Sequence, residues 1–180
     1  MTTTTEQTAD LLAEVLTELA PVAGGVTEDQ LHDPTPCTDY DVAQLREHVL
    51  GWLAIFAAGF ADPAAEVTAA ARTITQSIRA GAAGRPLRLG DSGMPGDMAL
   101  SMILWEYQVH GWDLARATGQ PWSPPPAAAE QSLAFAPGML SADYQGDGKA
   151  FGPRVPVPDA APPLDRLLGL SGRDPAWTAS

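Results

Sequence analysis

The spacing of apolar residues along the chain is typical of amphipathic helices. Apolar positions over residues 6–19 fall on a single helical stripe, and Pro21 is expected to end this first helix. A second stripe continues as far as Phe56, and either Thr38 or Asp39 is expected to cap its N-terminus. The first third of the chain therefore predicts two helices joined by a proline-containing connector.

Three further helical segments are expected downstream. They cover residues 64–82, 95–117 and 127–140, and glycine or proline residues separate them. Residues 83–93 alternate apolar and polar positions too briefly for a firm strand, so they predict a loop or a short hairpin. From residue 141 to the end, glycine and proline are dense and the chain is expected to be mostly coil.

These elements predict an all-α domain over residues 1–180. We expect an antiparallel four-helix bundle with a frayed N-terminus over residues 1–5. The coil-rich tail, 141–180, is expected to pack on the bundle and to form one or two helical turns over 164–170. Apolar tail residues are expected to hold it there: Phe151, Val155, Val157, Leu167 and Trp177.

Composition narrows the classes of partner. The 22 acidic residues outnumber the 10 basic ones, for a net charge of −12, so neither nucleic acid nor an anionic membrane is an expected partner. The chain starts without a secretory signal pattern and contains no transmembrane run, which predicts a cytoplasmic protein. Its single cysteine, Cys37, excludes an intrachain disulfide. The expected partner is a small molecule, and the protein is expected to be a monomer or a homodimer.

Candidate chemistry is concentrated in two helical stripes. Glu106 and His110 stand four residues apart among large apolar side chains, and His48 lies on the inward face of the second helix. A buried carboxylate needs a partner, which a Glu–His ion pair or a metal ion could each provide. Two histidines and one carboxylate suit Zn²⁺ with an open position, and equally suit non-haem Fe(II).

Four nearby residues have less definite roles. Asp113, three residues after His110, is a candidate for supporting that histidine from behind or for capping a loop, and Arg116 is expected to pair with Asp113 or to bind a substrate carboxylate. Cys37 is expected to be a packed connector residue, with a nucleophilic thiol as the alternative. His32 is expected to be a solvated loop residue. The second half of the chain also offers Arg154, Arg166 and Arg173 as cations.

Three segments resemble one protein family. "TPCTDYDVAQLREHVLGW" and "WEYQVHGWDLARATGQ" are similar to the two ligand-bearing segments of the DinB-like, mycothiol-dependent maleylpyruvate isomerase N-terminal family. The ending "LDRLLGLSGRDPAWTAS" is similar to the tail of the short actinobacterial branch of that family. The resemblance spans nearly the whole chain and implies a DinB-like bundle in which His48, Glu106 and His110 bind a divalent metal, usually Zn²⁺, with Fe or Ni as alternatives.

The resemblance also implies a class of reaction. Relatives activate a low-molecular-weight thiol, mycothiol in actinobacteria, for S-transfer or isomerisation, because a thiol next to a cation ionises readily. The isomerase carries a further domain without a counterpart here, so maleylpyruvate is not the expected substrate. Two alternatives stay open at this point: a metal-dependent lyase, cyclase or oxygenase that uses the same residues, and a non-catalytic metal or small-molecule binding protein.

Overall fold

The computed structural model describes residues 4–60, 86–89, 92–141, 144–147 and 151–179, together with positions 74, 76, 84 and 149. The fold is all-α and DinB-like, as predicted. Its described helices are α1 (Thr5–Gly24), α2 (Val42–Phe60), α4 (Gly96–Ala117), α5 (Pro126–Phe135) and α6 (Pro163–Leu170), with short 3-10 turns at η1 (Glu28–Gln30) and η3 (Ala136–Gly138).

Helix α1 is longer at both ends than its sequence pattern suggests. The Thr4 side chain accepts a hydrogen bond from the Gln7 backbone N–H, and the Gln7 side chain accepts one from the Thr4 backbone N–H. This capping box starts the helix at Thr5; of the residues expected to fray, 1–3 lie outside the described part of the chain. The helix also continues past Pro21. A proline removes one helical hydrogen bond, but the continuing turn buries Val22 and Ala23 in the core.

Helix α2 begins at Val42, a few residues later than predicted. Asp41 is its cap, and not Thr38 or Asp39: the Asp41 carboxylate accepts from the backbone of Gln44 at 2.8 Å. The Gln44 side chain in turn accepts from the Asp41 backbone at 3.0 Å. The apolar stripe of α2 is buried, and its members are Val42, Leu45, Val49, Leu53 and Phe56.

The region between α2 and α4 is described only in part. The predicted third helix, 64–82, lies outside the described residues except for the buried Ile74 and the exposed Gln76. The hairpin alternative for residues 83–93 is correct, because β1 (Leu87–Leu89) pairs antiparallel with β2 (Ser92–Met94). This short hairpin leads directly into α4.

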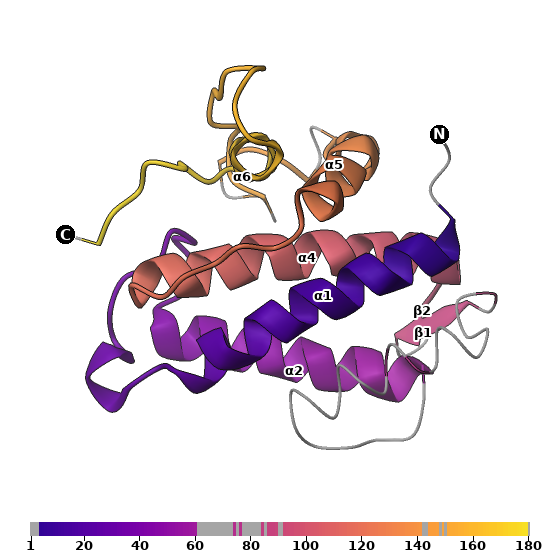
Figure 1. The fold of residues 1–180 in the computed structure, drawn as a ribbon, viewed down its shortest axis with the longest axis horizontal. Helices are drawn as coiled ribbons and strands as arrows, with labels where there is room; N and C mark the ends of the chain where they lie inside the picture. The colour runs from indigo at the N-terminus through magenta and orange to yellow at the C-terminus, as the bar shows by residue number, and fades with distance from the viewer. Residues whose placement is uncertain are drawn as a thin grey trace.

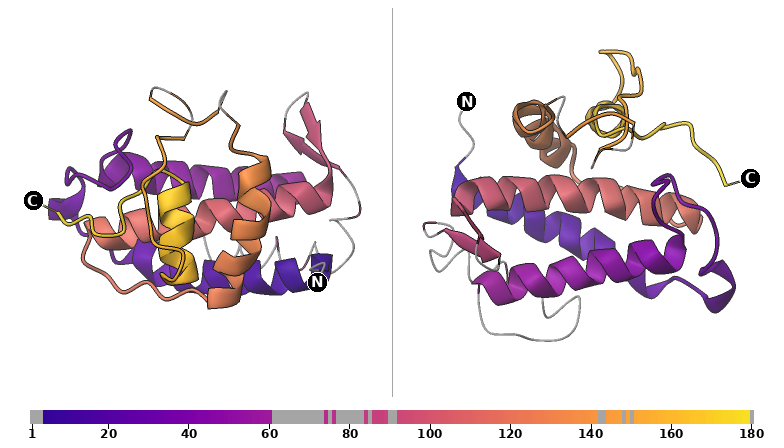
Figure 2. Two further views of the ribbon diagram at one scale, coloured as in Figure 1. Left: turned by 90° about the horizontal axis from the view of Figure 1, so that it is seen from above. Right: turned by 180° about the vertical axis from the view of Figure 1, so that it is seen from behind.

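The long helices α1, α2 and α4 form a bundle, and the C-terminal elements cover the outer face of α4 (Figure 1 and Figure 2). Helix α2 runs antiparallel to both α1 and α4, whereas α1 and α4 are neighbours that run in the same direction (Figure 1). Helices α5 and α6 lie side by side across α4 (Figure 2). The fifth helix ends at Phe135, short of the predicted Leu140: Pro137 has no backbone N–H to continue the α-helical hydrogen bonds, and the chain tightens into the 3-10 turn η3.

The tail packs on α4 with helix α6, and Leu167 and Trp177 are part of this contact. The ring of Phe151 stacks on that of Trp105 with centroids 4.8 Å apart and planes 10° from parallel. These contacts form a second apolar cluster on the outer face of α4. Helix α4 is therefore enclosed on both sides, and most of its residues are buried.

Gly111 allows the segment after α4 to fold back onto the helix. A Cβ atom at Gly111 would overlap the ring of Trp122, so only glycine leaves room for this contact. The contact lies one residue after His110 and fixes the path of the chain from α4 to α5.

Replacing Gly111 by alanine is expected to destabilise the protein by about 1–3 kcal/mol, because overpacking against Trp122 outweighs the better helix propensity of alanine. The measurement is chemical denaturation followed by circular dichroism. Gly51→Ala is the matched control, since among the described residues no atom beyond the helix's own nearby backbone lies within 4 Å of a Cβ there, and it should be neutral or stabilising. Equal effects of the two substitutions would contradict this explanation.

Candidate metal centre

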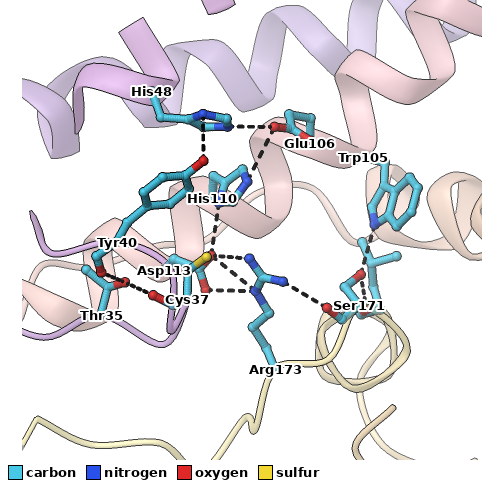
Figure 3. Close-up of polar contacts among 11 residues, drawn as sticks. Thr35, Cys37, Tyr40, His48, Trp105, Glu106, His110, Asp113, Ser171 and Arg173 are labelled. Carbon is cyan, nitrogen blue, oxygen red and sulfur yellow. Dashed lines mark hydrogen bonds and ion pairs between the residues drawn. The ribbon is translucent and has the colours of Figure 1, made fainter. Parts of the chain in front are cut away.

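Three side chains from two helices converge at one point. His48 of α2 faces Glu106 and His110 of α4, and Glu106 Oε1 lies 3.3 Å from the Nε2 atom of each histidine (Figure 3). One potential ligand atom from each residue lies within 4.8 Å of the other two. The three residues that the sequence singled out are thus brought together.

Helical geometry explains the convergence. Glu106 and His110 are one turn apart, so both side chains leave α4 on the same face. That face packs against α2, where the Tyr107 hydroxyl donates to the Val49 carbonyl at 3.4 Å and the Tyr107 ring contacts Phe56 edge-on. Packing between the apolar side chains of α2 and α4 therefore sets the distance between His48 and its two partners.

The carboxylate and the imidazoles are partly withdrawn from water. Side-chain exposure is 22% for His48, 28% for Glu106 and 11% for His110. Burial alone would raise the pKa of Glu106, but the charge of His110 and the hydrogen bonds from both histidines hold that pKa well below its usual range. Burial likewise opposes the charging of His110, yet Glu106 and Asp113 raise the pKa of His110 to about 9. Without a metal, Glu106 and His110 form an ion pair at neutral pH.

The second nitrogen of His48 has its own partner. The Tyr40 hydroxyl lies 3.3 Å from His48 Nδ1, and the two rings are 4.9 Å apart. Thr35 holds the connector that carries Tyr40, because its hydroxyl lies 2.8 Å from the carbonyls of Cys37 and Tyr40. In the hydrogen bond to Glu106 the proton lies on His48 Nε2; a metal at this position would need the Nε2 lone pair instead, and an Nδ1–H that donates to the phenol oxygen would stabilise that tautomer.

Asp113 and Arg173 support His110 from behind. Asp113 is fully buried; its Oδ2 atom lies 3.1 Å from His110 Nδ1 and 3.0 Å from Arg173 Nη2. The predicted partner Arg116 is not used: it points outward and its Nε donates to the Trp177 carbonyl at 2.8 Å. Arg173 is among the cations that the sequence offers, but its role could not be predicted because nothing local connects it to Asp113.

Cys37 lies behind the same histidine and is buried. Its sulfur and the side chains of His110 and Asp113 form a second group with metal-ligand atoms within 4.8 Å of one another. Arg173 already neutralises Asp113 there, and burial raises the pKa of the Cys37 thiol, which disfavours a thiolate ligand or nucleophile. The packed-connector interpretation fits these contacts better. His32 is solvated, with a side chain 92% exposed.

A cavity of about 440 Å³ opens in front of the three converging residues. The connector before α2 forms one wall with Cys37 and Tyr40, and α4 forms another with Trp105 and Val109. The C-terminal segment supplies the rest of the lining: Gly146, Asp147, Lys149, Phe151, Gly152, Pro153, Val155, Ser171, Gly172 and Arg173. The tail is therefore part of the site, a contribution that its coil-like sequence does not reveal.

The residues fit the metal that the family resemblance implies. Two imidazole nitrogens and one carboxylate oxygen are a donor set for Zn²⁺ or Fe(II), and the adjoining cavity leaves room for a further ligand. A cation would also replace the proton that now links His110 to Glu106.

Over the described part of the chain, no helix combines the length and the apolar character that crossing a membrane requires.

Comparison with known proteins agrees with this architecture. The sequence model of the mycothiol maleylpyruvate isomerase N-terminal domain matches residues 12–91, which include His48 but end before Glu106. Two uncharacterised proteins of Mycobacterium tuberculosis, from strains CDC 1551 and H37Rv, are each 34% identical over 167 residues, covering 86% of this chain and 91% of the relative. No solved structure matches. The relatives are actinobacterial, and the chain belongs to the mycothiol maleylpyruvate isomerase N-terminal domain family.

Proposed function

We propose that the chain is a metal-dependent enzyme that activates a low-molecular-weight thiol of the mycothiol type for S-transfer to, or isomerisation of, a small electrophile. The observation that carries the proposal is the convergence of His48, Glu106 and His110 at the wall of a cavity of about 440 Å³. That volume lies within the usual range of small-molecule sites. Family membership supports the link to mycothiol.

The proposed resident ion is Zn²⁺, held by His48, Glu106 and His110, with Fe or Ni as alternatives. When bound, such an ion supplies a Lewis-acidic position beside which a thiol loses its proton more easily. This is the chemistry that a thiol-dependent reaction needs at neutral pH.

The chain's own residues orient the ligands and shape the cavity. Tyr40 and Asp113 each lie beside an Nδ1 atom, so both imidazoles are fixed with Nε2 toward Glu106. The stacked rings of Trp105 and Phe151 provide an apolar wall against which a small substrate can exclude water. The lining carries charges of both signs, with Lys149 alongside the carboxylates of Asp39 and Asp147, so it offers both donors and acceptors to a polar substrate or thiol.

His48→Ala is expected to abolish metal binding and to leave a folded bundle, since His48 supplies one of three proposed ligands while its backbone lies inside α2. Elemental analysis should find about one metal ion per chain in the purified protein and almost none in the variant. His32→Ala is the matched control, because that side chain is solvent-exposed. Full metal content in the His48 variant would refute the proposed ligand set.

Uptake of Zn²⁺ near neutral pH is expected to release protons. Metal-free His110 holds a proton up to its pKa of about 9, and the metal must replace that proton on Nε2. Below that pH the apparent dissociation constant should rise about tenfold for each pH unit, as expected for one displaced proton. Calorimetry in two buffers with different ionisation enthalpies measures the release, and an enthalpy that does not depend on the buffer would contradict it.

Thiol-dependent turnover is the test of the reaction class. With mycothiol and a chromogenic aryl halide, the metal-loaded protein should accelerate thioether formation, and a chelator should remove the acceleration until Zn²⁺ is restored. Glu106→Gln should lose the activity, because the amide no longer supplies an anionic ligand. Metal-bound protein without thiol-dependent turnover would overturn the proposal, and bound iron with oxygen uptake would favour an oxygenase instead.

A further inference from the structure

We infer that Arg173, carried by the C-terminal segment, is a positioning residue of the metal centre. It holds the buried carboxylate of Asp113 in the orientation in which that carboxylate fixes the ring of His110. The inference rests on the metal site of the proposed function but not on the thiol or the reaction.

Hydrogen bonds connect Arg173 of the tail to Asp113, and Asp113 in turn to the proposed metal ligand His110. The Nε atom of Arg173 lies 3.4 Å and 3.2 Å from the two oxygens of Asp113, and its Nη2 lies 3.0 Å from Oδ2. The same Oδ2 atom is 3.1 Å from His110 Nδ1 (Figure 3). Asp113 is fully buried and cannot be hydrated, so its charge and its direction both depend on Arg173.

The end of α6 places Arg173 independently of the site. The backbone N–H of Arg173 donates to the Leu168 carbonyl at 2.9 Å, and that of Gly172 donates to the Gly169 carbonyl at 3.2 Å. With Gly172 at a φ of +82°, this is a Schellman motif, which turns the chain back toward the body of the protein. Ser171, just before the turn, accepts from Trp105 of α4 at 2.9 Å. The guanidinium is thus fixed by backbone and by α4 before any ligand binds.

The surroundings of Arg173 favour positioning over direct binding of a substrate. Its charge is already neutralised by Asp113, and its Nη1 atom donates to the Ser171 carbonyl at 2.9 Å. The side chain is only 9% exposed. A substrate anion that reached Arg173 would also meet the carboxylate of Asp113, so Arg173 acts through that carboxylate and through His110.

The test compares Arg173→Met, Asp113→Asn and the double variant in the full-length chain. Zn²⁺ affinity, measured by competition with a chromophoric chelator, should fall about 10–100-fold in each single variant. The double variant should bind no more than about threefold more weakly than Asp113→Asn alone, because Arg173 acts through Asp113. Arg173→Lys, which keeps the charge, should recover part of the affinity. Arg166→Met on α6 is the matched control and should change affinity by less than about twofold.

Wild-type affinity in Arg173→Met, or losses that multiply in the double variant, would overturn the inference. An NMR measurement on the metal-free protein separates this outcome from failure of the proposed metal site. It can also be made on a variant whose stability is reduced. In the metal-free protein, the Nδ1 proton of His110 should give a protected nitrogen-bound NMR signal that Arg173→Met loses and Arg173→Lys retains. Should wild type bind no Zn²⁺, the same signal decides the inference, and its persistence in Arg173→Met refutes it.

Discussion

The contact between α2 and α4 is the constraint on which the rest of the structure depends. The two helices face each other through a buried apolar surface, and His48, Glu106 and His110 are polar groups placed within that contact. Their separation is set by core packing and not by the polar groups themselves. Since cores resist small displacements, the three ligand atoms are held close together even without a cation between them.

Both carboxylates on this part of α4, Glu106 and Asp113, have a counter-charge, which explains how an acidic protein tolerates them in its interior. Glu106 is balanced by the histidines, and Asp113 by Arg173 and His110. Leaving either carboxylate unpaired would cost several kcal/mol, more than hydrogen bonds alone recover. The network is therefore a condition for packing α4 as tightly as it is packed, in addition to whatever it contributes to a reaction.

Much of the fold could be predicted from sequence, because it follows from local periodicity. The helix expected over residues 95–117 differs from α4 by one residue at its start. The coil-rich tail, with a short helix near residues 164–170, could be predicted as well. Glu106 and His110 share a face by spacing alone, and His48 could be placed on an inward stripe. Their convergence appears in the structure, while their binding of a metal stays a prediction.

What sequence could not supply was the pairing of distant segments. Spacing favoured Arg116 as the partner of Asp113, but Arg116 points outward on α4 and Asp113 points inward. The true partner, Arg173, lies 60 residues away and arrives through a turn. The stretch "LLGLSGR" does contain a signal, because a glycine after an apolar helical run marks the end of a helix. It does not show which residue the Arg173 side chain will contact.

The C-terminal segment contains two features: a close approach between the backbones of Gly152 and Gly172, and a loop whose ends pair with each other without that approach. Gly172 passes so near the Gly152 carbonyl that a Cβ atom there would lie 2.8 Å from its oxygen, so these two backbones admit no larger residue at Gly172. The loop between Gln145 and Phe151, which carries Lys149 into the cavity lining, is closed by its own backbone pairing before the chain reaches this close approach. Changes in the length and chemistry of that loop would thus alter the cavity lining while the support of His110 stays in place.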